Sequence, residues 1–463
     1  MFAKETYINR RKQLMKDVKS GVILILGNGD SPFNYPANTY TFRQDSTFRY
    51  FFAYALQNLV GVIDIDEGKE YLFGEEVDMD DIIWTGPVPS LRDRAEEIGV
   101  DNVGTITDLR AFLDKAVFAG RKVHFTPPYR AENVNFISEL LHIEREYVKA
   151  YVSVELINAC VKQRSIKSEE EIIEIEKAID TAYIMHTTMM KMAAKEGTFE
   201  YEIAGAMEGI ALCGGGPVSF PIILTTHGEI LHGHDHSLQI KKERMIVSDA
   251  GCENTMGYCS DITRSVPVGG KFSQRQKDIY EAVLAAQQLV PSLVKPGVKY
   301  SEIHLAAVTR LGSALKELGI MKGNIQDAVK AGAMGLFMPH GLGHMMGLDV
   351  HDMENYGENY VGYDKKNVRS TQFGLSSLRL GRELQEGFVI TNEPGCYFIP
   401  ALIDKWKAEN KCNDFIDYKV LETYKDFGGI RIEDDLLVTK DGCRLLGKYI
   451  PKTVNEIEEQ MSL

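Results

Sequence analysis

Residues 339–352 read PHGLGHMMGLDVHD and place three histidines, His340, His344 and His351, within twelve positions. The HGLGH segment has the i, i+4 histidine spacing of the zinc motif HExxH, but it lacks the glutamate that acts as the base in that motif. A zinc-protease helix of that kind is therefore a poor interpretation. A single histidine is usually a satisfied core or surface residue, whereas three so close together indicate a site.

Four carboxylates in glycine- and proline-punctuated contexts occur on either side of this stretch. They are Asp249 in VSDAG, Asp261 in CSDIT, Glu393 in TNEPG and Glu433 in RIEDD. Carboxylate oxygens are the ligands that hard divalent cations prefer, and paired cations are typical of hydrolases. Together with His344, the ordered set predicts a two-metal hydrolase.

Strand alternation orders the last of these motifs, GGIRIEDDLLVT at residues 428–439. Residues two apart on a strand share a face, so Arg431 and Glu433 are expected to point the same way and Asp434 the other way. We therefore include Arg431 among the residues expected to contact substrate. Asp434 and Asp435 are left out of the predicted ligand set.

The motifs PHGLGHMMGLDVHD, EPGCYF and GGIRIEDDLLVT resemble those of the creatinase and methionine aminopeptidase superfamily, and within it the Xaa-Pro peptidases. YTFRQDSTFRYFFAY, residues 40–54, is similar to the N-terminal domain that accompanies them. The resemblance implies an α/β N-terminal domain over residues 1–155 and an α+β pita-bread catalytic domain over residues 156–463. The segment between Asp249 and Asp261 is one residue longer than the family spacing, which affects the expected turn rather than the ligands.

The resemblance also implies how metal is bound. Two divalent cations are expected, with manganese as first choice and cobalt or zinc as alternatives. Asp261 and Glu433 would bridge both cations, Asp249 would bind one, and His344 and Glu393 would bind the other. A hydroxide held between the cations would attack the scissile carbonyl, with Glu393 as general base.

Further residues are expected to act on the substrate. By resemblance, His232 and His351 stabilise the oxyanion and bind the peptide, and His340 lies beside them. His234 and His236 continue the HxHxH run after His232, and we expect them in a solvated loop outside the site.

Two features favour a dipeptidase, that is a prolidase, over an aminopeptidase P acting on longer peptides. SSLRLGRELQEG, residues 376–387, resembles the prolidase segment that supplies an arginine for the free carboxylate of the dipeptide, and Arg379 occupies the matching position. The long insertion at residues 398–429 is also prolidase-like, although a surface helix pair explains it equally well. The remaining alternative is a non-catalytic pita-bread binding protein, which intact ligands disfavour.

Composition limits the partners. With 463 residues and a net charge of −14, the chain is long enough for two domains and too acidic to favour nucleic acid or an anionic membrane. The seven cysteines form no CxxC pair, and no stretch is apolar enough to span a bilayer. We expect a cytoplasmic homodimer or higher homo-oligomer that acts on small peptides.

Local patterns predict several elements. Ser168 and Glu171 form a capping box before a long amphipathic helix, and further helices are expected near residues 274–294 and 301–319. Gly214 to Gly216 should terminate a helix. RMIVSDAG and SDITRSVPV should pair as strands. The alternating aromatic segment at residues 40–54 is expected to form a half-buried strand or a subunit contact.

Overall fold

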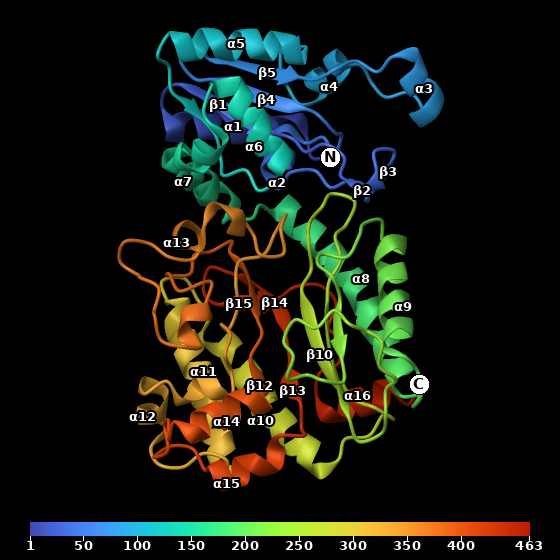
Figure 1. The fold of residues 1–463 in the computed structure, drawn as a ribbon, viewed down its shortest axis with the longest axis vertical. Helices are drawn as coiled ribbons and strands as arrows, with labels where there is room; N and C mark the ends of the chain where they lie inside the picture. The colour runs from blue at the N-terminus through green and yellow to red at the C-terminus, as the bar shows by residue number, and fades with distance from the viewer. The chain divides into compact units, whose positions relative to one another are not determined.

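The structure is a computed structural model that describes residues 1–463 (Figure 1). The chain forms two compact units, residues 1–164 with 355–360, and residues 165–354 with 361–463. The boundary at 155/156 that the sequence suggests stays a prediction. No helix has both the length and the apolar character that crossing a membrane requires.

The N-terminal unit is built on a mixed sheet of five strands in the order β6-β5-β4-β1-β7. These are β1 (Val22–Leu26), β4 (Val60–Asp64), β5 (Lys69–Phe73), β6 (Asn102–Gly104) and β7 (Val123–His124). Leu24, Val62 and Phe73 pack with Leu113 of α5 (Ile106–Phe118) and Leu140 of α6 (Ala131–Leu141) in one buried cluster. The remaining helices of this unit are α1 (Lys4–Val18), α2 (Ser46–Phe52), α3 (Met79–Thr85), α4 (Leu91–Glu97) and α7 (Val154–Arg164), beside a short hairpin of β2 (Pro32–Tyr35) and β3 (Asn38–Thr39).

Within the aromatic segment at residues 40–54, Ser46–Phe52 forms helix α2, so the predicted half-buried strand is wrong, while the alternative of a subunit contact stays a prediction. Asp45 caps the helix, because its side chain accepts hydrogen bonds from the backbone N–H groups of Thr47 and Phe48. Phe48, Phe51 and Phe52 are fully buried. Their i, i+3, i+4 spacing fits one helical face, and this cap together with that spacing overrides the local alternation.

The second unit begins with the helix pair α8 (Glu169–Ala193) and α9 (Glu200–Cys213). The predicted capping box of Ser168 and Glu171 starts α8, and Gly214 ends α9 as expected. An antiparallel sheet in the order β10-β9-β8 follows, made of β8 (Ile223–Thr225), β9 (Met245–Ala250) and β10 (Ile262–Pro267). The predicted pairing of the last two strands is confirmed.

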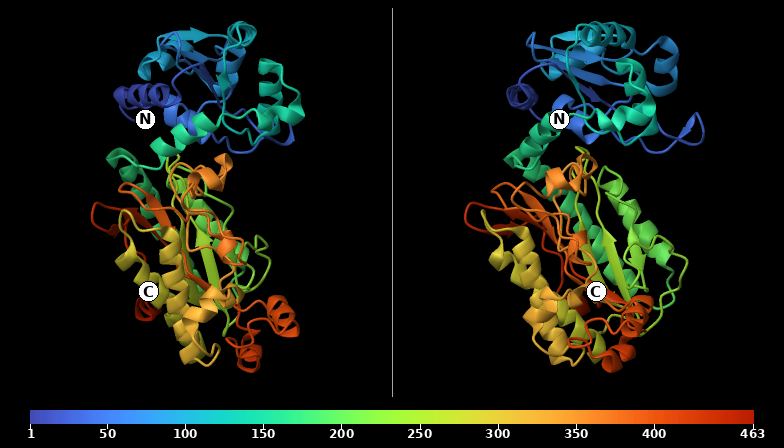
Figure 2. Two further views of the ribbon diagram at one scale, coloured as in Figure 1. Left: turned by 90° about the vertical axis from the view of Figure 1, so that its left-hand side faces the viewer. Right: turned by 60° about the vertical axis from the view of Figure 1, so that its left-hand side comes forward.

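A second helix pair and a second group of strands complete the unit. Helices α10 (Gln274–Leu293) and α11 (Tyr300–Glu317) lie within two residues of their predicted bounds. They are followed by α12 (Ile325–Lys330), α13 (Glu358–Val361), β11 (Val389–Asn392), β12 (Gly395–Tyr397), α14 (Pro400–Ala408), α15 (Tyr418–Leu421), β13 (Gly429–Arg431), β14 (Asp434–Val438), β15 (Cys443–Leu445) and α16 (Val454–Gln460). Figure 2 shows the strands of this unit between the green pair α8 and α9 and the yellow pair α10 and α11.

Candidate metal centre and substrate pocket

The first two predicted ligands come from the β9 and β10 pair. Asp249 lies on β9, and Asp261 immediately precedes β10. The antiparallel register pairs Thr263 with Asp249, which brings both carboxylates to the same end of the sheet. In the turn between the strands, the Asn254 side chain accepts hydrogen bonds from the N–H groups of Met256 and Tyr258. Asp249 and Asp261, at the two ends of this segment, both line the cavity.

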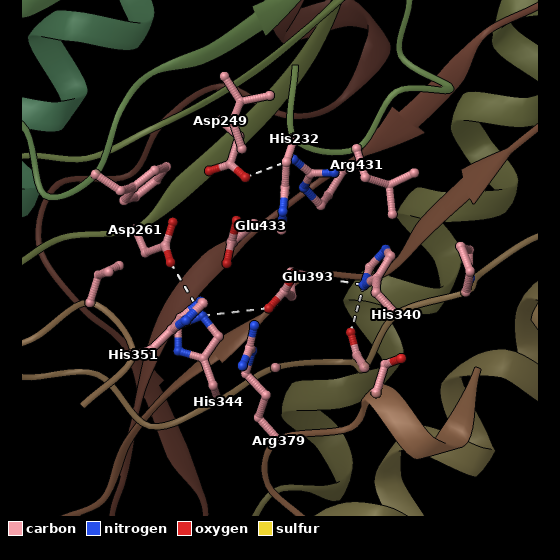
Figure 3. A pocket seen from close by; sticks show the side chains of 18 of the residues that line it. His232, Asp249, Asp261, His340, His344, His351, Arg379, Glu393, Arg431 and Glu433 are labelled. Carbon is pink, nitrogen blue, oxygen red and sulfur yellow. Dashed lines mark hydrogen bonds and ion pairs between the residues drawn. The ribbon is translucent and has the colours of Figure 1, made fainter. Parts of the chain in front are cut away.

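The other three predicted ligands come from the second half of the unit. His344 exchanges hydrogen bonds with Thr391 of β11, its N–H donating to Thr391 Oγ1 (3.1 Å) and its carbonyl accepting from the Thr391 N–H (3.0 Å). Glu393 directly follows β11. The Glu433 N–H donates to the Thr263 carbonyl (3.1 Å), which fixes Glu433 against β10. All five side chains line one cavity of about 540 Å³ (Figure 3).

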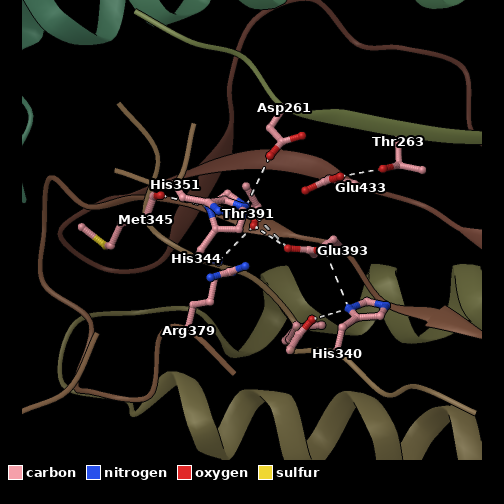
Figure 4. Close-up of polar contacts among 12 residues, drawn as sticks. Asp261, Thr263, His340, His344, Met345, His351, Arg379, Thr391, Glu393 and Glu433 are labelled. Atoms are coloured by element: carbon pink, nitrogen blue, oxygen red, sulfur yellow. Dashed lines mark hydrogen bonds and ion pairs between the residues drawn. The ribbon is translucent and has the colours of Figure 1, made fainter. Parts of the chain in front are cut away.

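Distances within the cavity define a metal-binding arrangement. His344 Nε2 lies 3.3 Å from Asp261 Oδ2 and 3.6 Å from Glu393 Oε1 (Figure 4). Ligand atoms of Asp261, His344 and Glu433 all lie within 4.8 Å of one another. The His344 Nδ1–H donates to the Met345 carbonyl (3.0 Å), so the Nε2 lone pair faces the carboxylates. One imidazole nitrogen and several carboxylate oxygens therefore point at a common centre.

The buried carboxylates of the site favour the binding of cations. Burial, followed by repulsion from neighbouring carboxylates, raises the pKa of Asp261 and Glu433 well above their ordinary values. Burial likewise raises the pKa of Glu393 to about 7. Asp249 Oδ1 is buried without a hydrogen-bond partner. Buried carboxylates that lack compensating protons or partners are costly, and divalent cations satisfy that need, so these residues fit metal ions.

Arg431 is held inside the site by several partners. Its Nη2 donates to Asp249 Oδ2 (2.7 Å), its Nε to Thr263 Oγ1 (3.1 Å) and its Nη1 to the Tyr397 hydroxyl (2.7 Å). The Thr263 hydroxyl in turn donates to Glu433 Oε2 (2.6 Å). The predicted shared face of Arg431 and Glu433 is confirmed, since both line the cavity.

The two aspartates after Glu433 have structural partners. Asp434 points away and pairs with Arg264 (2.7 Å), as the alternation predicts. Asp435 Oδ2 accepts a hydrogen bond from the Asp261 N–H (3.1 Å), so it positions a candidate ligand. Sequence alternation placed Asp435 on the correct face, but nothing in the sequence identified its partner, which lies on another strand.

The predicted histidines all line the cavity. The His340 Nδ1–H donates to the Gly341 carbonyl (2.7 Å), and His340 Nε2 therefore accepts from the Tyr397 hydroxyl (2.9 Å). Burial lowers the pKa of His340 to about 3, so this imidazole is neutral. The rings of His351 and His344 lie with centroids 4.2 Å apart. His232 also lies in this pocket, near Asp249 and Arg431 (Figure 3).

His234 also lines the cavity, so the prediction that it lies outside the site is wrong. His236 has a different role, because its Nδ1 bonds the Leu224 carbonyl (3.0 Å). The HxHxH spacing after His232 is therefore the sequence signal that could have found His234.

The rest of the cavity combines apolar and basic groups. Phe220, Ile223 and Leu231 supply an apolar wall, and Arg379 brings a guanidinium close to the ligand set (Figure 3). The insertion at residues 398–429 forms helices α14 and α15 and contributes none of the residues that line the cavity. The insertion therefore fits the explanation of a surface helix pair, the alternative to a prolidase-specific feature. The cavity can accommodate a short peptide.

Fold and site together fit a metal centre in a substrate-sized cavity, and comparison with known proteins specifies the family. The model of Metallopeptidase family M24 matches residues 174–440, and that of the aminopeptidase P N-terminal domain matches residues 7–124. The chain is 33% identical over 458 residues to the human Xaa-Pro dipeptidase, covering 96% of this chain and 90% of that protein. It is also 33% identical to an Aspergillus clavatus protein named "Probable Xaa-Pro aminopeptidase pepP", covering 97% and 95%.

Solved structures agree with this result. Escherichia coli aminopeptidase P, zinc-substituted and in complex with product, has a TM-score of 0.81 and 27% identity and covers 100% of this chain and 98% of its own. The chain belongs to Metallopeptidase family M24. The predicted fold class, an α/β N-terminal domain with a pita-bread catalytic domain, is confirmed. Divalent metal ions are the cofactor that membership of this family implies.

Proposed function

We propose that the protein hydrolyses the Xaa-Pro bond of dipeptides. The observation that carries this proposal is Arg379, whose guanidinium lines the same cavity as the five candidate ligands. A free proline carboxylate is the natural partner for an arginine fork, and such a group follows the scissile bond only in a dipeptide. The alternative is an aminopeptidase P activity on longer Xaa-Pro peptides, which names among the relatives also support.

The candidate ligands would hold two divalent ions, and the donor chemistry favours manganese. Four carboxylates and one imidazole suit manganese or cobalt better than a thiolate zinc centre, with zinc as a further alternative. Asp261 and Glu433 would be shared by the two ions. Bound there, the cations supply Lewis-acid chemistry at the scissile carbonyl and acidify water.

Protein groups perform the proton transfers and bind the oxyanion. Glu393 acts as general base and accepts a proton from the attacking water. His232 and His351 donate hydrogen bonds to the oxyanion. Arg431 orients this arrangement by pairing with Asp249 (2.7 Å), and His340, whose Nδ1–H donates to the Gly341 carbonyl, lines the cavity beside Glu393.

Substituting Arg379 tests the choice of dipeptide. Charge-assisted hydrogen bonds of about 1.5–3 kcal/mol are lost in Arg379→Ala, which corresponds to roughly 10- to 150-fold. We expect kcat/KM to fall by that factor for Ala-Pro and much less for Ala-Pro-Ala, whose proline carbonyl is an uncharged amide. An equal loss on both substrates, or a wild-type preference for the tripeptide, would favour aminopeptidase P.

We also propose a cytoplasmic homodimer or higher homo-oligomer. Helix α3 has no buried residue, and Met79, Ile83 and Trp84 on it are exposed, as expected of a surface that a second copy covers. The seven cysteines are all free, which suits a reducing compartment. Light scattering of the purified protein measures the oligomer, and a monomer would contradict that part of the proposal.

A further inference from the structure

Glu354 lies between two residues of the substrate pocket. Arg379 Nη1 donates to Glu354 Oε1, and the His351 Nδ1–H donates to Glu354 Oε2 (2.6 Å). Arg379 and His351 line the cavity themselves, and Figure 3 shows both side chains beside Glu393 and His344. One carboxylate thus holds a guanidinium and an imidazole that are both proposed to contact substrate.

Glu354 is ionised in this arrangement. The hydrogen bond from His351, followed by charge interactions with His351 and Arg379, holds the pKa of Glu354 below its ordinary value despite the opposing effect of burial. An ionised carboxylate can only accept hydrogen bonds, so His351 Nδ1 must carry a proton, and His351 can also donate from Nε2 to the oxyanion only as the doubly protonated imidazolium. Arg379, which is proposed to bind the carboxylate of the substrate, is therefore already paired with the carboxylate of Glu354.

We propose that Glu354 is a specificity-determining residue that sets how strongly the pocket prefers a free C-terminal carboxylate over an uncharged amide. This inference rests on the proposed function, in which Arg379 recognises that carboxylate. A guanidinium has five N–H donors in a fixed fork, so a substrate carboxylate can still bind Arg379 beside Glu354. The bound substrate carboxylate then lies close to the negative charge of Glu354, and this repulsion weakens its binding relative to that of an uncharged amide.

The partial exposure of Glu354 and Arg379 limits how strongly Glu354 can weaken the binding of a substrate carboxylate. The Glu354 side chain is 40% exposed and that of Arg379 is 32% exposed, so solvent screens part of the repulsion. We therefore expect about a tenfold change in selectivity when the Glu354 charge is removed, which corresponds to about 1.4 kcal/mol. A purely structural carboxylate would instead change the kinetics of charged and uncharged substrates in parallel.

The test compares Ala-Pro with Ala-Pro amide, two substrates that differ in one charge. In Glu354→Gln the ratio of kcat/KM for Ala-Pro to that for the amide should rise about tenfold over wild type, mainly through a lower KM for Ala-Pro. Glu354→Asp keeps the charge and should hold the ratio near the wild-type value. Glu386→Gln, at an exposed carboxylate outside the cavity, is the matched control. An unchanged or lower ratio in Glu354→Gln would overturn the inference.

Arg379→Ala separates this inference from the proposed function. If Arg379→Ala loses activity equally on Ala-Pro and its amide, the role of Arg379 in carboxylate recognition fails. If Arg379→Ala is selective but Glu354→Gln leaves the ratio unchanged, only the role of Glu354 fails. In the double variant, Glu354→Gln should no longer alter the ratio, because the guanidinium that couples the two carboxylates is gone.

Discussion

At the residue scale, the site depends on carboxylates that lack full compensation from the protein. Asp261 and Glu433 are both buried, and both lie within reach of His344 Nε2 and of each other. Each amide substitution removes one negative charge from a centre whose occupancy depends on that charge. Such changes should act on metal binding more strongly than on the fold.

We expect Asp261→Asn and Glu433→Gln to lose turnover at least ~10²-fold while their circular dichroism remains that of the wild type. Metal analysis should find fewer than two ions per chain in these variants and two in the wild type. Glu281→Gln, an exposed carboxylate on α10, is the control. Variants that keep full activity with two ions bound would contradict the bridging role.

The histidines can be tested separately from the metal. His232→Ala and His351→Ala should each lower kcat by ~10²–10³, the usual cost of losing one donor to an oxyanion. His142→Ala, an exposed histidine of the N-terminal unit, is the appropriate control, since His234 lines the cavity. Near-normal kcat at full metal content would refute the role of either histidine.

At the element scale, a buried ion pair joins the start of α8 to the loop that carries His351. Lys167 Nζ lies 2.9 Å from Asp352 Oδ2, and both side chains are 1% exposed. Asp352 directly follows His351 in the chain. The pair therefore couples the position of a proposed substrate residue to the helix that opens the catalytic unit.

Lys167→Met should lower the free energy of unfolding by about 3–5 kcal/mol, because it leaves the Asp352 charge buried without this partner. Lys177→Met, which removes an exposed partner of Glu174, should cost less than about 1 kcal/mol. Urea denaturation of both variants gives the comparison. Equal midpoints for the two would show that the buried pair is not structurally important.

Sequence patterns predicted some elements of this chain well and others poorly, for physical reasons. Helices with strong caps, such as α8 after Ser168, and strands with clear periodicity, such as β9 and β10, formed where expected. The segment that contains α2 did not, because the Asp45 cap and the helical spacing of its buried phenylalanines override the local alternation there. Partners across elements, such as Glu354 with Arg379, depend on loop conformation and cannot be obtained from spacing.

At the scale of the whole molecule, the acidic cluster couples metal binding, stability and pH. The folded-state pKa of Glu393 is raised from 4.5 to about 7, and those of Asp261 and Glu433 are raised in the same direction. A raised carboxyl pKa means that the folded protein holds its protons more tightly than the unfolded chain. The contribution of these protons to the free energy of unfolding is complete at a pH below the carboxyl pKa of the unfolded chain. It is lost as pH rises through the carboxyl pKa of the folded protein.

Chelated protein should therefore lose stability as pH rises from about 4.5 to about 7, the range over which Glu393 is shifted, whereas metal-loaded protein should lose much less. The gain from metal, about 2.7 kcal/mol when free metal is a hundredfold above its Kd, should be largest at the upper end of this range. Calorimetry of both forms across pH measures the difference in Tm. A gain that shrinks as pH rises would contradict this prediction.

The most direct test of the central claim, a metal-dependent Xaa-Pro peptidase, is the rate of hydrolysis of Ala-Pro against Ala-Ala in protein stripped by a chelator and then reloaded with manganese. Proline forms a tertiary amide without an N–H, so a site built for it does not depend on that donor. The account predicts that the reloaded protein cleaves Ala-Pro far faster than Ala-Ala and that the stripped protein cleaves neither. Equal rates on the two dipeptides, or full activity without metal, would contradict it.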